Sequence, residues 1–256
     1  MDEKKKMIHP KAIIHKKATI KNDVEIGPGS LIDENVIIEE SSVIEDNVRI
    51  KGNVKIGKNV HLHRGVTIDS PQHISFKDFC HSTVVSDGST LREFVTVHGS
   101  TTETPTIIGK NCYLMAFSHV GHDSELQNNV ILTNFVQLGG HVKIGEKAVI
   151  GGGVMVHQRM EIGTRSMIGA MIPVLKSVPP YSMIADLGSG TKIVSINRRG
   201  MSDSLDLRKN AVEAMKLLKT KTNKRELVEE LTNLKNNEAF ILKDFINSNT
   251  KYYKWN

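Results

Sequence analysis

Five histidines gather in the middle of the chain, and they are the side chains best suited to catalysis there: His98, His119, His122, His141 and His157. An imidazole, with an unperturbed pKa of about 6.5, can accept a proton at neutral pH and return it. Several histidines that converge on one place would supply a general base and groups that hold a polar substrate. A neighbouring carboxylate can fix the tautomer of such a base, and Asp123 directly follows His122.

The same stretch favours proton transfer over two other kinds of chemistry. No serine or cysteine carries the signature of an activated nucleophile, so we expect a substrate hydroxyl or amine to attack directly. Zinc is the first alternative, because the sequence HVGHD could supply ligands. Neither an HxxxH nor a CxxC spacing occurs, so a general base needs fewer assumptions and we expect no metal. The backbone N–H of Gly140 could donate to a developing oxyanion.

A six-residue repeat predicts how these residues are placed. An apolar anchor returns at every sixth position in one series from Ile8 to Ile68 and in a second from Ile108 to Val174. Two positions before nearly every anchor lies a small or branched residue. This pattern indicates a parallel β-helix in which each hexapeptide supplies one short face of the coil. Glycine often follows the anchor, as at Gly27, and we interpret it as a corner residue with unusual φ.

Three faces make one turn of such a coil, so residues about eighteen apart should lie above one another at a spacing of about 4.8 Å. This map stacks four pairs of interest: His122 on Gly140, Asp123 on His141, Gly139 on His157, and Gly140 on Gln158. The map therefore brings scattered motifs to one edge of two or three adjacent turns.

The frame of the repeat slips between Ile68 and Ile108. The apolar residues between them keep the six-residue step but are out of phase with both long series. We expect two protruding loops of about five extra residues each, near 70–82 and 99–106. Inserts on a solenoid usually lie on one face and often bear function. Without the second insert, His98 falls beside the turn that follows His119.

The pattern divides the chain into three segments: a coil over residues 7–185, a joint over 186–203 and a helical domain over 204–256. The coil should end near VPPYSMI, because consecutive prolines cannot continue a ladder. Ser204 or Ser202 is the expected N-cap of the first helix, and a second helical stretch is broken at Asn236 and Asn237. The basic run KTKTNKR at 219–225 is either a solvated connection or a contact for an acidic partner.

Composition limits the partners and the compartment. A formal net charge of +6 and a pI near 9.2 favour phosphates or acidic proteins as partners. Only 5% of residues are aromatic, which gives little support for base stacking, so we expect no nucleic acid. Two cysteines are too few for a disulfide framework. The first residues lack the apolar segment of a signal peptide, and no stretch could span a bilayer, so we expect a cytoplasmic protein without stable membrane insertion.

Four motifs in order carry a resemblance to a known family: SHVGHD (118–123), LGGHVKIG (138–145), VHQ (156–158) and VPPYS (178–182). With them, nearly the whole chain resembles the acyl-ACP–UDP-N-acetylglucosamine O-acyltransferases, which catalyse the first step of lipid A synthesis. The resemblance implies a left-handed parallel β-helix, an exception to the right-handed crossover rule, with a small C-terminal helical domain. It implies a homotrimer with sites between subunits. It also implies no cofactor, because acyl carrier protein brings the acyl group on its phosphopantetheine.

The resemblance further implies roles for single residues. His122 matches the general base that deprotonates the sugar 3-hydroxyl for attack on the acyl thioester, Asp123 the carboxylate that orients this base, and Gly140 the oxyanion donor. Met167 and Ala170 fall in the region that limits acyl-chain length. The positions that match substrate-contacting residues are His98, His119, His141, His157, Gln158 and Asn197.

The chain departs from the family on the side that binds the acceptor. In the first insert, His73 stands where the family has an aspartate that binds the sugar. The family's arginine pair aligns with Asp203 and Ser204, whereas Arg198 and Arg199 come earlier and are candidates to replace it. The acyl-transfer residues therefore look intact, and the acceptor side looks altered.

These observations predict an acyltransferase that moves a 3-hydroxyacyl group from acyl carrier protein to the 3-position of UDP-N-acetylglucosamine or a related nucleotide amino sugar. The changes at His73 and Asp203 leave open a nucleotide-sugar N-acyltransferase that uses acyl-CoA or acyl-ACP. A non-catalytic trimeric hexapeptide scaffold is the alternative from another class, and the stacking of His122 on Gly140 argues against it.

Overall fold

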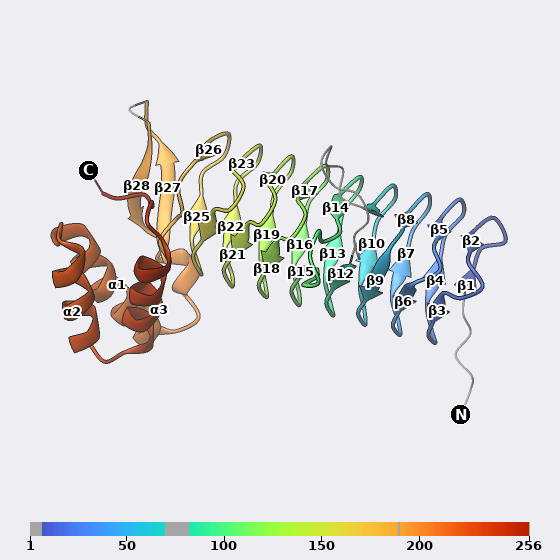
Figure 1. Ribbon diagram of the computed structural model, residues 1–256, viewed down its shortest axis with the longest axis horizontal. Helices are drawn as coiled ribbons and strands as arrows, with labels where there is room; N and C mark the ends of the chain where they lie inside the picture. The colour runs from blue at the N-terminus through green and yellow to red at the C-terminus, as the bar shows by residue number, and fades with distance from the viewer. Residues whose placement is uncertain (1–6, 70–81, 189, 256) are drawn as a thin grey trace.

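The computed structural model describes residues 7–69, 82–188 and 190–255, and its main body is a coil of short strands (Figure 1). The strands form three sheets, which we call A, B and C, with eleven, nine and eight strands. The chain passes from A to B to C and back again, so each turn adds one strand to each sheet. We call the three corners AB, BC and CA after the sheets that they connect. This is the parallel β-helix that the six-residue period predicts.

The strand bounds follow the repeat throughout. Sheet A contains β1 (Met7–Ile8), β4 (Glu25–Ile26), β7 (Val43–Ile44), β10 (His61–Leu62), β13 (Thr90–Leu91), β16 (Tyr113–Leu114), β19 (Ile131–Leu132), β22 (Val149–Ile150), β25 (Met167–Ile168), β27 (Ser182–Asp186) and β28 (Thr191–Ile196). Sheet B contains β2 (Ile13–Ile14), β5 (Leu31–Ile32), β8 (Arg49–Ile50), β11 (Thr67–Asp69), β14 (Thr96–His98), β17 (His119–Val120), β20 (Gln137–Leu138), β23 (Met155–Val156) and β26 (Pro173–Val174). Sheet C contains β3 (Thr19–Ile20), β6 (Val36–Ile38), β9 (Asn53–Ile56), β12 (Ser82–Val85), β15 (Thr106–Ile108), β18 (Glu125–Leu126), β21 (Lys143–Ile144) and β24 (Glu161–Ile162).

The anchors fill the inside of the coil. Leu114, Val120 and Leu126 come from three successive faces, and each is 0% exposed. The small residues two positions earlier, such as Cys112, are buried beside them. Each buried aliphatic side chain contributes about 1.5–3 kcal/mol relative to its exposed state, and this one column of contacts runs the length of the coil.

The pairing of strands supports the expected stacking of residues eighteen apart and gives the lengths of the two inserts. Most paired residues are eighteen apart, but Ile68 lies opposite Val97, which is 29 later. Val85 lies opposite Ile108, which is 23 later. The second insert therefore adds five residues, as expected, whereas the first adds eleven. The smaller estimate was wrong because it counted an extra coil face between β11 and β12, and the pairing contains none there.

Both inserts leave the coil at corner BC. The first lies between β11 in sheet B and β12 in sheet C, and the second lies between β14 and β15 of the same two sheets. Residues 70–81, which include His73, lie outside the described residues.

Most corners contain a residue with positive φ three positions after the anchor, and most of these residues are not glycine. Asp123 and His141 occupy such positions, each with φ of 58°. The expectation that the glycine directly after an anchor supplies the positive φ was wrong. At Gly121, for instance, an added Cβ would lie 2.6 Å from the Gly139 backbone carbon of the next turn. Glycine is needed there because successive turns approach too closely for a side chain, not because of unusual φ.

The coil does not stop at its prolines. β27 continues sheet A parallel to β25, and β28 returns antiparallel to it. This hairpin occupies part of the stretch 186–203 that we expected to be a joint. Met183 pairs with Met167, sixteen residues earlier, so this last turn is two residues shorter than the usual eighteen. The prolines lie in the corner before the strand.

Three helices cover the end of the coil beyond the hairpin (Figure 1). Ser204 caps the first of them by accepting a hydrogen bond from the Leu207 N–H at 3.2 Å, and Asn236 caps the third. These are the expected cap and the expected break. None of the described helices is long and apolar enough to cross a membrane. The helical elements are the 3-10 turn η1 (Arg199–Met201), α1 (Leu205–Thr220), α2 (Lys224–Asn233) and α3 (Asn237–Ser248).

Candidate active site

Corner BC collects most of the residues that the sequence singles out. They come from four neighbouring strands of sheet B and their corners: His98 and His119 on β14 and β17, His122 and Asp123 after β17, Gly140 and His141 after β20, and His157 and Gln158 after β23. The six-residue period is therefore enough to bring them to one edge of the coil, where the chain passes from sheet B to sheet C.

His122 and Asp123 form a close pair within this corner. The Nδ1 atom of His122 lies 2.6 Å from Oδ2 of Asp123, and the two side chains are only 15% and 5% exposed. Neighbouring strand residues point to opposite faces, so the pair depends on the corner conformation of Asp123. An Nδ1–H that donates to the carboxylate puts the basic lone pair of the imidazole on Nε2.

The second insert holds the Asp123 carboxylate. Oδ1 accepts hydrogen bonds from the Thr101 N–H at 2.9 Å and the Thr102 hydroxyl at 3.2 Å. Oδ2 accepts from the Thr101 hydroxyl at 2.6 Å, and the Asp123 N–H donates to Thr106 Oγ1 at 2.9 Å. These threonines were not predicted from the sequence. The signal was the polar run STTET inside an insert that the repeat already placed at the histidine-rich edge.

These contacts decide the charge of Asp123. Burial raises the pKa of its carboxyl, but the hydrogen bonds from Thr101 and His122 lower the pKa by more. The net shift is downward, so the carboxylate is ionised at neutral pH and can stabilise an imidazolium on His122.

Gly140 lies directly over the His122 ring. A Cβ built on Gly140 would be 2.5 Å from Nε2 of His122 and 2.6 Å from its Cε1. Only glycine therefore leaves room for this imidazole. Among the described residues the Gly140 N–H donates to no backbone carbonyl, so it is available to a developing oxyanion.

Two further histidines enclose this pair. The Nε2 atom of His141 lies 3.6 Å from Asp123 Oδ2, and its ring meets the His122 ring edge-on at 5.1 Å between centroids. Burial lowers the pKa of His141, and the Asp123 charge opposes that shift. Burial also lowers the pKa of His119 to about 4, so His119 is neutral at pH 7. It contacts Thr96 Oγ1 at 2.8 Å and the His98 ring at 4.6 Å between centroids.

Several of the expected site residues are not part of this cluster within one chain. His157 and Gln158 are exposed at corner BC one turn beyond Gly140. Met167 lies in sheet A, and Ala170 is exposed in the following corner AB.

The expected nucleotide-contacting residues lie at corner CA. Asn197 is 4% exposed, and its amide donates to the Arg165 carbonyl at 2.8 Å and accepts from the Gly200 N–H at 3.2 Å. Arg198 and Arg199 are exposed beside it. In one chain these residues and His122 therefore lie on different edges of the coil.

Asp203 has a structural partner of its own at this corner. Its carboxylate lies 2.6 Å from Lys147 Nζ and accepts bonds of 2.8 and 3.0 Å from the Arg165 guanidinium. The hydrogen bonds from Arg165 and Lys147 hold the pKa of Asp203 well below its usual range. An acidic residue here neutralises two cations of the coil, so it changes the charge that this corner presents.

Metal binding is a second chemistry that the donor atoms allow. The ligand atoms of His122, Asp123 and His141 lie within 4.8 Å of one another. However, each Asp123 oxygen already accepts two hydrogen bonds, and a metal would have to displace some of them. This arrangement favours proton transfer over metal binding at corner BC.

Comparison with known proteins identifies relatives of this chain. The family model described as bacterial transferase hexapeptide (six repeats) matches residues 35–70 and 105–140. The acyl-[acyl-carrier-protein]–UDP-N-acetylglucosamine O-acyltransferase of Burkholderia orbicola is 35% identical over 170 residues, which are 62% of this chain and 65% of that protein. The enzyme of that name from Burkholderia mallei is 36% identical over 137 residues, or 52% of each protein. The matched part thus spans about half to two thirds of these curated relatives.

Solved structures extend the likeness to nearly the whole chain. The UDP-N-acetylglucosamine O-acyltransferase of Moraxella catarrhalis has a TM-score of 0.91 and 31% identity, with 96% of this chain and 99% of that chain covered. The chain belongs to the UDP-N-acetylglucosamine O-acyltransferase family. The Campylobacter jejuni UDP-N-acetylglucosamine acyltransferase has a TM-score of 0.90 and 28% identity, with 97% and 99% covered. The resemblance carried by the four motifs is confirmed, and so is the β-helix with its C-terminal helices.

Proposed function

We propose that this chain transfers an acyl group, of 3-hydroxyacyl type, from acyl carrier protein to the 3-hydroxyl of UDP-N-acetylglucosamine or a related nucleotide amino sugar. Family membership supports the reaction class. The observation that carries the proposal for this chain is the arrangement of His122 between the Asp123 carboxylate and Gly140. A chain kept only as a scaffold would not need an imidazole locked against a buried carboxylate by an insert.

His122 acts as the general base in this proposal. Its Nε2 takes the proton of the attacking hydroxyl as the sugar oxygen forms a bond to the thioester carbonyl carbon. The carbonyl oxygen becomes an oxyanion, which the Gly140 N–H stabilises. When the carbon–sulfur bond breaks, the imidazolium returns the proton to the leaving thiolate. Asp123 stabilises the imidazolium throughout, because it is ionised and hydrogen-bonded to Nδ1.

The other histidines of corner BC hold the substrates. His98, His119, His141 and His157, with Gln158, would contact the acyl chain and the sugar nucleotide. His119 is neutral at pH 7, so it serves as a hydrogen-bonding group and not as a cation. The acyl group is carried on phosphopantetheine, and the mechanism uses no other cofactor.

We propose a homotrimer with its sites between chains. Asn197, Arg198 and Arg199 lie at corner CA, whereas His122 lies at corner BC of the same coil. If all of them contact one nucleotide sugar, corner CA of one chain must face corner BC of the next. A threefold assembly closes such a head-to-tail contact.

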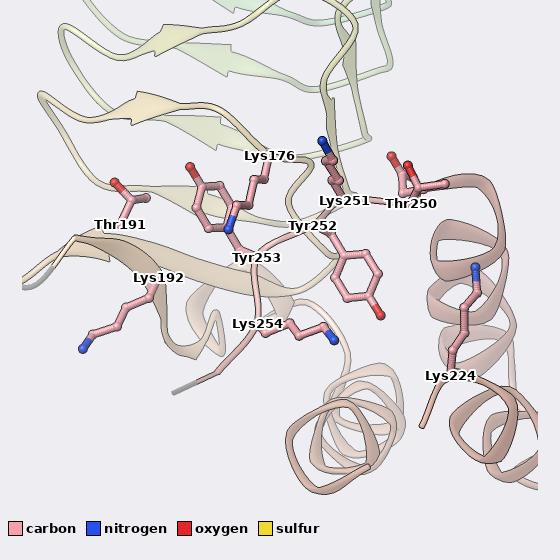
Figure 2. A pocket seen from close by; sticks show the side chains of 10 residues that line it. Lys176, Thr191, Lys192, Lys224, Thr250, Lys251, Tyr252, Tyr253 and Lys254 are labelled. Atoms are coloured by element: carbon pink, nitrogen blue, oxygen red, sulfur yellow. The ribbon is translucent and has the colours of Figure 1, made fainter. Parts of the chain in front are cut away.

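The carrier protein needs a surface that attracts negative charge, and a lysine-rich pocket near the C-terminus supplies one. Figure 2 shows lysines from β28, α2 and the C-terminal segment arranged around Tyr252 and Tyr253. Charged groups at the rim of a surface chiefly raise association rates. We propose that the acidic carrier docks here; the lysines are Lys176, Lys192, Lys224, Lys251 and Lys254.

One observation favours a second candidate, a nucleotide-sugar N-acyltransferase that uses acyl-CoA or acyl-ACP. Asp203 occupies a position where the family resemblance places an arginine, and it pairs with Lys147 and Arg165. This reduces the positive charge near Asn197 and so alters the acceptor side. The same general base would serve an amine acceptor.

An acyl-transfer assay distinguishes these candidates. Several acyl-ACP and acyl-CoA donors are paired with a panel of nucleotide sugars that carry either a 3-hydroxyl or a 3-amine. We expect His122→Ala to lower kcat by about 10²–10⁴-fold, the usual contribution of a general base. His15→Ala, at the same corner but far down the coil, should keep full activity. Full activity in His122→Ala would refute the mechanism, and no transfer to any acceptor would favour the scaffold.

A further inference from the structure

A second histidine cluster lies at corner AB, on another edge of the coil from His122. Glu45 follows β7, His61 lies in β10 and His63 follows β10, and these two strands are neighbours in sheet A (Figure 1). Residues two apart in a strand share a face, so His61 and His63 both point out of the coil on either side of the buried Leu62. Glu45 is eighteen residues before His63 and therefore lies in the turn directly next to it.

The three side chains point their donor atoms at one place. Oε1 of Glu45 lies 2.8 Å from Nε2 of His61 and 3.1 Å from Nδ1 of His63. The two imidazoles stack at 4.0 Å between centroids with an interplanar angle of 18°. In a tetrahedral site with metal–ligand distances of about 2.0–2.2 Å, the ligand atoms are about 3.3–3.6 Å apart. For metal binding the Glu45–His61 separation would open by about 0.5–0.8 Å and the Glu45–His63 separation by about 0.2–0.5 Å, and the stacked rings would rotate so that both nitrogen lone pairs face the cation.

We propose that Glu45, His61 and His63 form a binding site for a divalent transition-metal cation of the zinc class. Two imidazoles and one carboxylate are a common zinc ligand set that leaves one position for water. Imidazole ligands favour zinc, copper, iron and nickel over magnesium or calcium, which prefer oxygen. All three side chains are partly exposed, so a cation can enter from solvent.

Groups around the cluster hold these ligands in position. The Arg64 N–H donates to Oε2 of Glu45 at 3.0 Å and leaves Oε1 directed at the histidines. Such contacts orient a ligand and strengthen binding. Oε1 of Glu93 lies 3.8 Å from Nδ1 of His63. The nearby Arg92 cation is bound to Glu93 and to the Tyr113 hydroxyl, so its charge is largely neutralised.

The competing account is a hydrogen-bonded histidine–carboxylate cluster that needs no metal. In that account protonated histidines would pair with Glu45. The geometry favours the metal, because both imidazole nitrogens lie next to the same carboxylate oxygen, Oε1 of Glu45, and one cation can bind all three atoms. At corner BC, in contrast, each Asp123 oxygen already accepts two hydrogen bonds.

A bound cation would join two successive turns of the coil from outside. It would act on corner AB, away from the residues proposed for acyl transfer, and its binding therefore does not depend on the proposed function.

The test is zinc binding to protein without a histidine tag, stripped with a chelator and titrated with Zn²⁺ against a chromophoric competitor. We expect each chain to bind one Zn²⁺ ion tightly. His63→Ala and Glu45→Gln should each weaken binding at least about tenfold, because loss of even an outer-shell contact typically costs about 10–100-fold. Co²⁺ in place of zinc should show the visible absorption of a tetrahedral site in wild type only.

A matched control separates this cluster from corner BC. His141→Ala removes a ligand from the only other group of donor atoms found among the described residues and should keep the tightly bound Zn²⁺ ion. Unchanged affinity in both His63→Ala and Glu45→Gln, or loss of this ion in His141→Ala, would overturn the proposal. Absence of any tightly bound Zn²⁺ ion in wild type would do the same.

Discussion

Replacement of Gly140 by alanine tests the site with the smallest chemical change. The new methyl carbon would lie 2.5 Å from Nε2 of His122, whereas ordinary contacts begin near 3.4 Å. The imidazole must therefore move by about 1 Å, and a displacement of that size costs about 10²-fold in rate. This corresponds to about 2.7 kcal/mol of the activation barrier. The backbone N–H remains, so the loss would report the position of the base.

Gly152 provides the matched control. Like Gly140, it lies two positions after a buried anchor, but its added Cβ would meet nothing closer than the Asn134 carbonyl oxygen at 3.5 Å. Neither glycine has a positive φ, so alanine should fold at both. We expect Gly152→Ala to keep its kcat and both variants to keep the thermal midpoint within a few degrees.

The assay is steady-state acyl transfer with saturating donor and acceptor, repeated in a His122→Ala background. If the substitution acts through the imidazole, it should cost little once that ring is gone, because the two changes affect one contact. A kcat for Gly140→Ala within twofold of wild type would refute the reasoning. An equal loss in both backgrounds would show that the glycine acts by some other route.

Two further predictions concern the groups around His122. Thr101→Val removes a hydrogen bond to the charged Asp123, which is worth about 1.5–3 kcal/mol, and should lower kcat by about tenfold or more. Thr101→Ser keeps the hydroxyl and should retain activity. Equal rates for the valine and serine variants would contradict the role of the second insert. For His119, the folded chain binds a proton only near pH 4 whereas the unfolded chain binds one near 6.5, so protons favour the unfolded state between these values. We expect about 2 kcal/mol of the free energy of unfolding to be lost through this group between pH 7 and pH 5. His119→Gln should remove that part of the pH dependence, as measured by urea denaturation at each pH. An unchanged pH dependence in the variant would show that another group causes it.

The repeat made corner BC predictable. A coil with one strand per sheet per turn converts a sequence separation of eighteen into direct contact, and so His122, Gly140 and His141 could be grouped from spacing alone. The second insert could be sized for the same reason. The first could not, because an eleven-residue insert and one coil face plus five residues leave the same apolar positions in the sequence.

What the sequence determined by itself is the parallel β-helix and the stacking of its turns, since burial of an anchor at every sixth residue fixes which side chains face the core. Only the tertiary structure decided the contacts that do not repeat. Thr101 reaches Asp123 from an insert with no period to place it, and Asp203 reaches Arg165 from beyond the hairpin. Glu45 and His63 fit the eighteen-residue rule, yet their donor atoms converge only because the corner turns both side chains outward to one point. Side-chain direction at a corner depends on φ and on the neighbouring turn, and spacing alone contains neither.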